Sequence, residues 1–128
     1  MLRPAVQFHK VFKVEQEGET VVVIPQGHPI AFRYNEIHVE ANAVIRLLDD
    51  AGLKNVVLDF SVTDYASSMI IGALIRMARK VTNEGGQAVM CHANENMFEI
   101  LTTMNLLKLW PYYDTREEAL AALVAMAS

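Results

Sequence analysis

The fold of this chain is limited most strongly by a short run near its middle, Val56 to Phe60, in which every residue except Asp59 is apolar. A strand with one side in solvent alternates apolar and polar residues, whereas this run offers apolar side chains on both of its faces. Such a strand belongs in a sheet that other elements cover on both sides, and helices packed on a sheet provide that cover. The run therefore predicts an α/β fold.

Strands and helices alternate on either side of this run. Residues 11–24 predict a β-hairpin that turns at Glu17-Gly18-Glu19, and residues 87–91 predict a further short strand. A helix is predicted from about Asn35, with its buried face formed by Ile37, Ala41, Val44, Ile45 and Leu48. A second helix is predicted from Ser67 or Ser68 to Gly85-Gly86, with its buried face formed by Ile71, Leu74, Ile75 and Ala78.

The last third of the chain predicts a third helix, a short edge strand and a fourth helix. The third helix starts at Asn94 or Asn96, ends near Asn105, and is expected to bury Met97, Ile100, Leu101 and Met104. Residues 109–112 predict the edge strand. The run from Thr115 to Glu118 has the form of a capping box, and the helix it opens is expected to bury Leu120, Leu123 and Val124.

These elements predict an α/β sandwich, with a mixed sheet of four to five strands and about four helices packed on it. A length of 128 residues suits one domain that spans residues 1–128. Residues 1–10 are expected to form an N-terminal lead that is free to be flexible.

Composition argues against several classes of protein. The net charge is −4 and no segment concentrates lysine and arginine, so we expect no direct binding of nucleic acid. No apolar stretch reaches the length of a membrane span and the start shows no secretory signal, so we expect no membrane insertion. The one cysteine, Cys91, allows no internal disulfide and fits a reducing compartment. We therefore expect a soluble, cytoplasmic protein.

No pattern in the sequence supports catalysis. The chain has neither a dinucleotide-binding nor a P-loop glycine motif, and its histidines lack the spacing that places two ligands on one metal. Cys91 precedes His92, but neighbours in a strand point to opposite faces, so Cys91 is interpreted as a buried, unreactive side chain. We expect no enzyme activity, no cofactor and no metal site.

Residues 61–74 connect the apolar strand to the second helix through a polar turn and a pair of serines. One reading is structural, with Ser67 or Ser68 as the N-cap whose hydroxyl accepts a backbone N–H. Met69 and Ile70 are apolar where a first turn tolerates polar groups, and an apolar patch beside hydroxyls suits a docking site. We predict a partner-binding surface formed by Asp64, Tyr65, Ser67, Ser68, Met69, Ile70 and Arg76.

From Phe12 onward the sequence resembles the STAS family, the domain of bacterial anti-sigma-factor antagonists and of sulfate-transporter tails. The family pattern is a strand ending in Asp-(apolar)-Ser, a turn ending in an aromatic residue, and Asp-Ser-Ser-Gly-(apolar)-Gly at the start of a helix. The corresponding residues here are Asp59-Phe60-Ser61, Tyr65, and Ser67-Ser68-Met69-Ile70-Ile71-Gly72. The similarity continues through Gly85-Gly86, the strand to Cys91, residues 106–111 and residues 113–120.

The resemblance implies a regulatory protein that binds another protein. In the family, the serine at the position of Ser68 is phosphorylated by a partner kinase that is itself an anti-sigma factor, and the phosphorylated domain releases that partner. This chain has Ser67, Met69 and Ile70 where the family pattern has Asp, Ser and Gly, and Ile30 where an acidic residue is often found. We expect an anti-sigma factor or a kinase-like ATPase as partner, and a chain that is a monomer or a weak homodimer.

A second function is open at this point. Some STAS relatives bind nucleotides or lipids, or associate with the ATPase of a transporter. The loop of residues 25–32, with Gln26 and His28, and the helix-start residues Asn94 and Asn96 could offer hydrogen-bond donors to an anion. This alternative predicts a transporter accessory subunit or a module that binds a small ligand.

Overall fold

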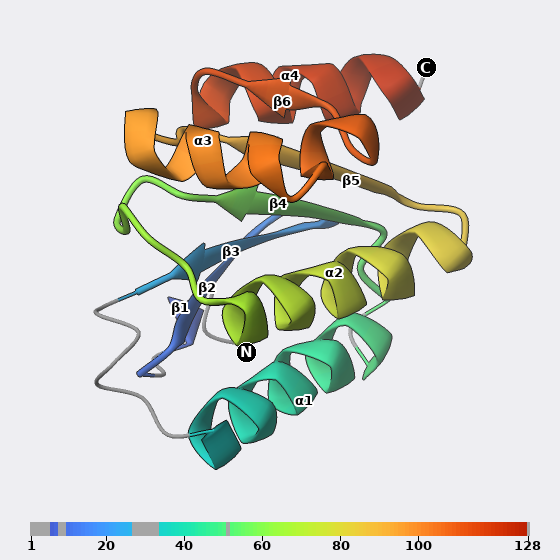
Figure 1. Cartoon of the computed structure of the whole chain (residues 1–128). Coiled ribbons are helices and arrows are strands. Elements are labelled where there is room, and N and C mark those ends of the chain that lie inside the picture. Colours follow the sequence, from blue (N-terminus) through green and yellow to red (C-terminus); the bar gives the residue numbers. More distant parts are fainter. Residues whose placement is uncertain (1–5, 8–9, 27–33, 51, 128) are drawn as a thin grey trace.

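The computed structural model describes residues 6–7, 10–26, 34–50 and 52–127. In chain order its elements are β1 (Val6–Gln7), β2 (Phe12–Glu17), β3 (Thr20–Pro25), α1 (Tyr34–Asp50), β4 (Asn55–Asp59), α2 (Ser68–Asn83), β5 (Gln87–Cys91), α3 (Glu95–Thr103), a 3₁₀ turn (Leu106–Lys108), β6 (Tyr112–Tyr113) and α4 (Arg116–Ala127). Figure 1 shows that the strands form one sheet and that the helices pack beside it. The predicted α/β class is confirmed.

A six-stranded sheet in the order β1-β2-β3-β4-β5-β6 organises the protein. The first three strands pair antiparallel, while β3, β4, β5 and β6 run parallel. α1, α2 and α3 connect the successive parallel strands, and parallel pairs need such crossovers. The carboxyl ends of the parallel strands therefore meet at one edge of the sheet, where loops in α/β proteins commonly form binding sites.

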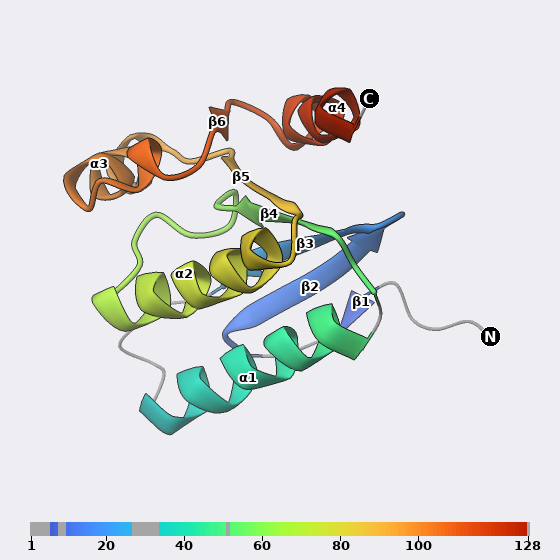
Figure 2. The ribbon, with the colours of Figure 1, turned by 90° about the vertical axis from the view of Figure 1, so that its right-hand side faces the viewer.

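Helices cover both faces of the sheet, as Figure 2 shows. The larger core contains buried residues of α1, α2 and α3, whereas buried residues of α4 lie in the smaller core on the other face. β4 contributes to both, with Val56 and Leu58 in the larger core and Val57 in the smaller. The prediction that the apolar run is covered on both sides is confirmed.

The last helix begins as predicted and packs differently. The Thr115 N–H donates to Glu118 Oε1 at 3.2 Å and the Glu118 N–H donates to Thr115 Oγ1 at 3.1 Å, so the capping box is formed. Leu123 is buried and Leu120 partly buried, but the prediction for Val124 is wrong, because its side chain is 71% exposed. The buried stripe of α4 uses Ala119 and Leu123, four residues apart, which leaves Val124 on the outer face.

Three other predictions differ from the structure. Met104 is 39% exposed because α3 ends at Thr103, so the helical spacing no longer directs its side chain inward. The edge strand is residues 112–113, preceded by a 3₁₀ turn, rather than residues 109–112. Val6–Gln7 in the expected N-terminal lead form β1 and pair with β2. None of the described helices is long and apolar enough to cross a membrane.

Candidate functional site

The loop between β4 and α2 lies at the carboxyl edge of the sheet and is held by its own hydrogen bonds. Thr63 is buried, and its Oγ1 donates to the Tyr65 carbonyl at 2.7 Å and accepts from the Tyr65 N–H at 3.3 Å. Val62 and Tyr65 are 58% and 53% exposed. The inward hydroxyl of Thr63 thus fixes a loop that presents apolar side chains to solvent.

The two serines at the start of α2 have different roles. Ser67 is the N-cap, and its Oγ accepts from the Ile70 N–H at 3.3 Å. Ser68 is the first helical residue, and its side chain is exposed and makes no hydrogen bond with the described residues. The sequence left open which serine caps the helix; the structure assigns the cap to Ser67 and leaves the Ser68 hydroxyl in solvent.

The predicted partner-binding surface is formed in part. Asp64, Tyr65, Ser68 and Arg76 are exposed, Met69 is 37% exposed, and Ser67 is partly buried. Ile70 is 3% exposed and packs in the larger core, so its assignment to the surface is wrong. The buried stripe of α2 is wider than its sequence spacing indicated, because the sheet and α1 both pack against it.

A groove between α1 and α2 contains two of these residues together with residues of α1 that the sequence did not indicate as part of the site. Met69 and Arg76 line it from α2, and Ile37, His38 and Ala41 line it from α1. The two helices lie side by side in Figures 1 and 2. Because the groove residues of α1 lie some thirty positions before Met69, nothing in the local pattern around Ser68 connects that pattern with this surface.

A buried carboxylate anchors the start of the loop. Asp59 is 1% exposed; its Oδ1 accepts from the Ser61 N–H at 2.9 Å and its Oδ2 accepts from Arg116 Nε at 2.9 Å. Arg116 Nη1 also donates to Glu15 Oε1 on β2 at 2.6 Å. An arginine at the first position of α4 is disfavoured by the positive end of the helix dipole. Its pairing with Asp59 and Glu15 explains its place there and ties α4 and β2 to the loop.

Glu15 provides a pH test of this cluster. The hydrogen bond from Arg116 holds the pKa of the Glu15 carboxyl below its ordinary value of 4.5, against the opposing effect of partial burial. Replacing Arg116 with methionine is therefore expected to raise the Glu15 pKa, as followed by NMR titration of the side-chain carboxyl. Since a lowered pKa stabilises the folded state above pH 4.5, wild type loses this contribution as the pH falls through the folded-state pKa. An unchanged Glu15 pKa in the variant would contradict the pairing.

Comparison with known proteins assigns the chain to a family. The family model of the STAS domain matches residues 10–119. This chain belongs to the STAS domain family. It is 30% identical over 73 residues to BtrV of Bordetella bronchiseptica, which is provisionally described as an anti-sigma factor antagonist; the match covers 57% of this chain and 63% of BtrV.

Two solved structures show the same fold. A STAS domain protein of Planctomyces limnophilus, described as an anti-sigma-factor antagonist, has a TM-score of 0.70 at 23% identity, covering 91% of this chain and 98% of that one. The phosphorylated form of the Bacillus cell fate determinant SpoIIAA has a TM-score of 0.67 at 18% identity, covering 88% and 98% of the two chains.

Ser67 caps α2 without carrying a charge. Serine is among the best N-cap residues, so Ser67 satisfies the Ile70 N–H without placing a carboxylate beside Ser68. The first turn of α2, which starts at Ser68, also has no acidic side chain. Ser68 therefore stands at the positive end of a helix with no carboxylate in that turn to oppose an added phosphate.

Cys91 behaves as the sequence predicted. It is fully buried under α4, and burial raises the pKa of its thiol to about 12. A thiol with this pKa stays protonated at neutral pH and is a poor nucleophile. Across the described part of the chain, no three side chains of His, Cys, Asp or Glu come together in a way that could hold a metal ion.

The residues suggested for a small-ligand loop are only partly described. His28 lies outside the described residues, and the Gln26 N–H donates to the Val11 carbonyl at 2.8 Å. Asn94 is the N-cap of α3, and its Oδ1 accepts from the Met97 N–H at 2.9 Å, while Asn96 is exposed on the same helix. Asn94 thus has a structural role, and anion binding by this set stays a prediction.

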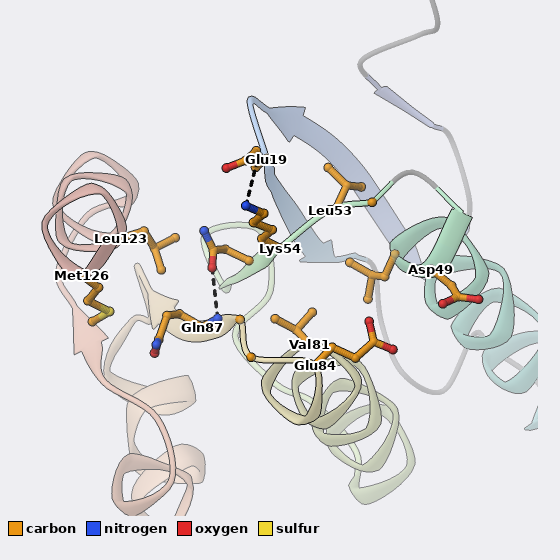
Figure 3. Close-up of a pocket in the computed structure, with 14 residues that line it drawn as sticks. Glu19, Asp49, Leu53, Lys54, Val81, Glu84, Gln87, Leu123 and Met126 are labelled. Atoms are coloured by element: carbon orange, nitrogen blue, oxygen red, sulfur yellow. Dashed lines mark hydrogen bonds and ion pairs between the residues drawn. The ribbon is translucent and has the colours of Figure 1, made fainter. Parts of the chain in front are cut away.

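A larger hollow, of about 470 Å³, lies at the opposite end of the STAS sheet (Figure 3). Several of its polar groups are already paired: Lys54 Nζ lies 3.5 Å from Glu19 Oε2, Asn55 Oδ1 accepts from the Gln87 N–H at 3.0 Å, and Asp49 and Glu84 pair with Lys80. None of the residues predicted for the partner-binding surface lines this hollow. The loop and groove beside Ser68 are therefore the better candidate site.

Proposed function

We propose that this STAS protein is an anti-sigma-factor antagonist that binds an anti-sigma factor through the surface around Ser68. The observation that carries the proposal is the different roles of the two serines: Ser67 caps α2, whereas the exposed Ser68 hydroxyl makes no hydrogen bond to any residue that the structure describes. Exposed Tyr65 and Met69 lie on either side of it in the sequence. The descriptions of BtrV and of the Planctomyces limnophilus protein support the same role.

The proposed role is binding rather than catalysis, and its place is the cytoplasm, where sigma factors act. The partner is a protein, namely an anti-sigma factor with the kinase activity that modifies Ser68. This assignment is supported by family membership and by the exposed hydroxyl.

Phosphorylation of Ser68 would switch the surface off by electrostatics. A phosphate adds up to about two negative charges, and the first N–H groups and dipole of α2 can stabilise them. The folded domain therefore tolerates the modification. A partner that packs on Met69 and Tyr65 would have to bury the same charge against apolar groups, which is strongly unfavourable. The phosphorylated form is accordingly the one that releases the partner.

Replacing Ser68 with aspartate is expected to weaken binding of the partner about tenfold or more, equivalent to about 1.4 kcal/mol, whereas Ser68→Ala keeps the wild-type affinity. The measurement is calorimetric titration with the serine-kinase anti-sigma factors of the same organism. Incubation with the binding kinase and ATP should add one phosphate, located at Ser68 by mass spectrometry and missing in Ser68→Ala.

Ser67→Ala is the matched control for this experiment. It removes the cap and should lower the free energy of unfolding by about 1 kcal/mol, while weakening binding of the partner less than Ser68→Asp does. Equal affinities of Ser68→Asp and Ser68→Ala would rule out the switch. Stable association with a transporter ATPase, and with none of the anti-sigma factors, would instead favour the accessory-subunit function.

A further inference from the structure

The groove between α1 and α2 has the form of a receptor for one apolar side chain. Its volume is about 210 Å³ and its lining is mostly apolar. The α2 wall consists of residues spaced three and four apart, which share one helix face: Met69, Gly72, Ala73 and Arg76. The α1 wall consists of Ile37, His38 and Ala41. Met69 follows Ser68 directly, so the groove adjoins the proposed switch.

Gly72 keeps this groove open. It lies inside α2 without a left-handed backbone, and, apart from its chain neighbours and the backbone of its own helix, a Cβ built on it meets no described atom within 4 Å. Glycine is a poorer helix former than every residue except proline, so alanine would fit and would favour the helix. The fold therefore gains nothing from glycine at this position. What the missing side chain supplies is space in the groove.

Arg76 gives the groove a charged end. Its Nη2 donates to Asn42 Oδ1 on α1 at 2.7 Å, which fixes the guanidinium between the two helices. The side chain is exposed, and no carboxylate of the described residues pairs with it. A guanidinium held in place presents its remaining N–H groups to an incoming carboxylate in a geometry suited to paired hydrogen bonds.

We propose that this groove receives a segment of the partner that carries an apolar side chain and, beside it, a carboxylate. The apolar side chain fills the space above Gly72, between Met69 and Ile37, and the carboxylate pairs with Arg76. The inference rests on the proposed function, since the segment belongs to the anti-sigma factor that docks at Ser68. It adds α1 to the interface. Gly72 would provide the space for the apolar side chain, and Arg76 would provide the positive charge for the carboxylate.

The test titrates variants with the anti-sigma factor that binds wild type. Gly72→Leu fills the groove and is expected to weaken binding about tenfold or more, because the partner's apolar side chain loses its pocket. Arg76→Glu is expected to weaken binding by a similar factor. Arg79→Glu is the matched control, because Arg79 is also exposed on α2 but does not line the groove. The same charge change there should alter affinity by less than about threefold.

A stability measurement tests Gly72 without any partner. Gly72→Ala is expected to raise the melting temperature by about 3 °C, and a lower melting temperature would overturn the inference because the fold would then need the glycine. If Gly72→Leu does not fold, the melting temperature of Gly72→Ala and the comparison of Arg76→Glu with Arg79→Glu still test the inference.

The outcomes separate this inference from the proposed function. Binding weakened by Ser68→Asp but unchanged by Gly72→Leu and Arg76→Glu overturns the groove and leaves the function standing. A wild type that binds no anti-sigma factor contradicts both. A wild-type dimer that becomes monomeric in Arg76→Glu, seen by sedimentation velocity, would identify a second copy of the chain as the occupant and overturn the inference.

Discussion

Replacing Arg116 with methionine is expected to lower the free energy of unfolding by about 3 kcal/mol, the lower end of the cost of removing one partner of a buried ion pair. Asp59 is 1% exposed, and in the variant it would keep the hydrogen bond from Ser61 but lose the positive charge that pairs with it. The lower end applies because the Arg116 side chain is 23% exposed and water can reach part of the site. Urea denaturation followed by circular dichroism measures the change.

The same variant should loosen the loop that presents Ser68. We expect faster hydrogen exchange of the Ser61 amide, because the carboxylate that accepts its proton loses its fixed position. Glu15→Gln is the control, since it removes the partly exposed ion pairs of Glu15 with Arg116 and Lys13 but leaves the Asp59–Arg116 pair, and it should cost less than about 1 kcal/mol. Equal destabilisation by the two variants would show that the Asp59–Arg116 pair contributes no more to the free energy of unfolding than the ion pairs of Glu15 do.

Gly86→Ala is the second substitution expected to have a large effect, about 3 kcal/mol of destabilisation, at the upper end for overpacking. A Cβ at Gly86 would lie 1.7 Å from the Lys54 carbonyl oxygen and 2.8 Å from Val81 Cγ1. The Lys54 backbone cannot move away cheaply, because the Lys54 and Asn55 N–H groups both donate to the Glu19 carbonyl, at 2.9 Å and 3.2 Å. Thermal and urea unfolding measure the effect.

Gly85→Ala separates crowding from backbone strain. Gly85 has φ +91° and no atom within 4 Å of a built Cβ, so alanine there is strained but not crowded. Its cost should be about 1 kcal/mol. If Gly86→Ala is no more destabilising than Gly85→Ala, the close approach of the α2–β5 turn to the start of β4 is not a constraint on the fold.

The features that the sequence predicted correctly depend on neighbours in the chain. The capping box of α4 and the cap of α2 are hydrogen bonds between residues three positions apart, so residue types alone indicate the capping box and limit the cap of α2 to Ser67 or Ser68. The double-sided burial of β4 follows from its run of apolar residues, and the strand-helix alternation follows from the periods of its neighbours. The motif around Ser68 is also nearly contiguous, so the sequence alone could mark this region as a candidate binding surface, which stays a prediction.

The parts of the site that the sequence missed depend on residues far apart in the chain. Arg116 is 57 residues from Asp59 and 101 residues from Glu15, and neither separation leaves a local trace. The α1 wall of the groove likewise comes from a helix that precedes the Ser68 motif. The resemblance to STAS domains marked Asp59 as part of a motif, and the capping-box pattern included Arg116, but only the fold shows that the two residues form one cluster.

By itself, the sequence determined the α/β class, the alternation of strands and helices after residue 11, and a serine cap at the start of α2, whereas the structure decided that Ser67 is the cap and Ser68 the first helical residue. Tertiary structure decided which apolar side chains are covered, so that Ile70 is buried, Met69 beside it is exposed, and Val124 faces solvent. The physical reason is range. Hydrogen bonding and helical period act over a few residues, whereas burial depends on which distant element covers a given face, and that is known only once the chain has folded.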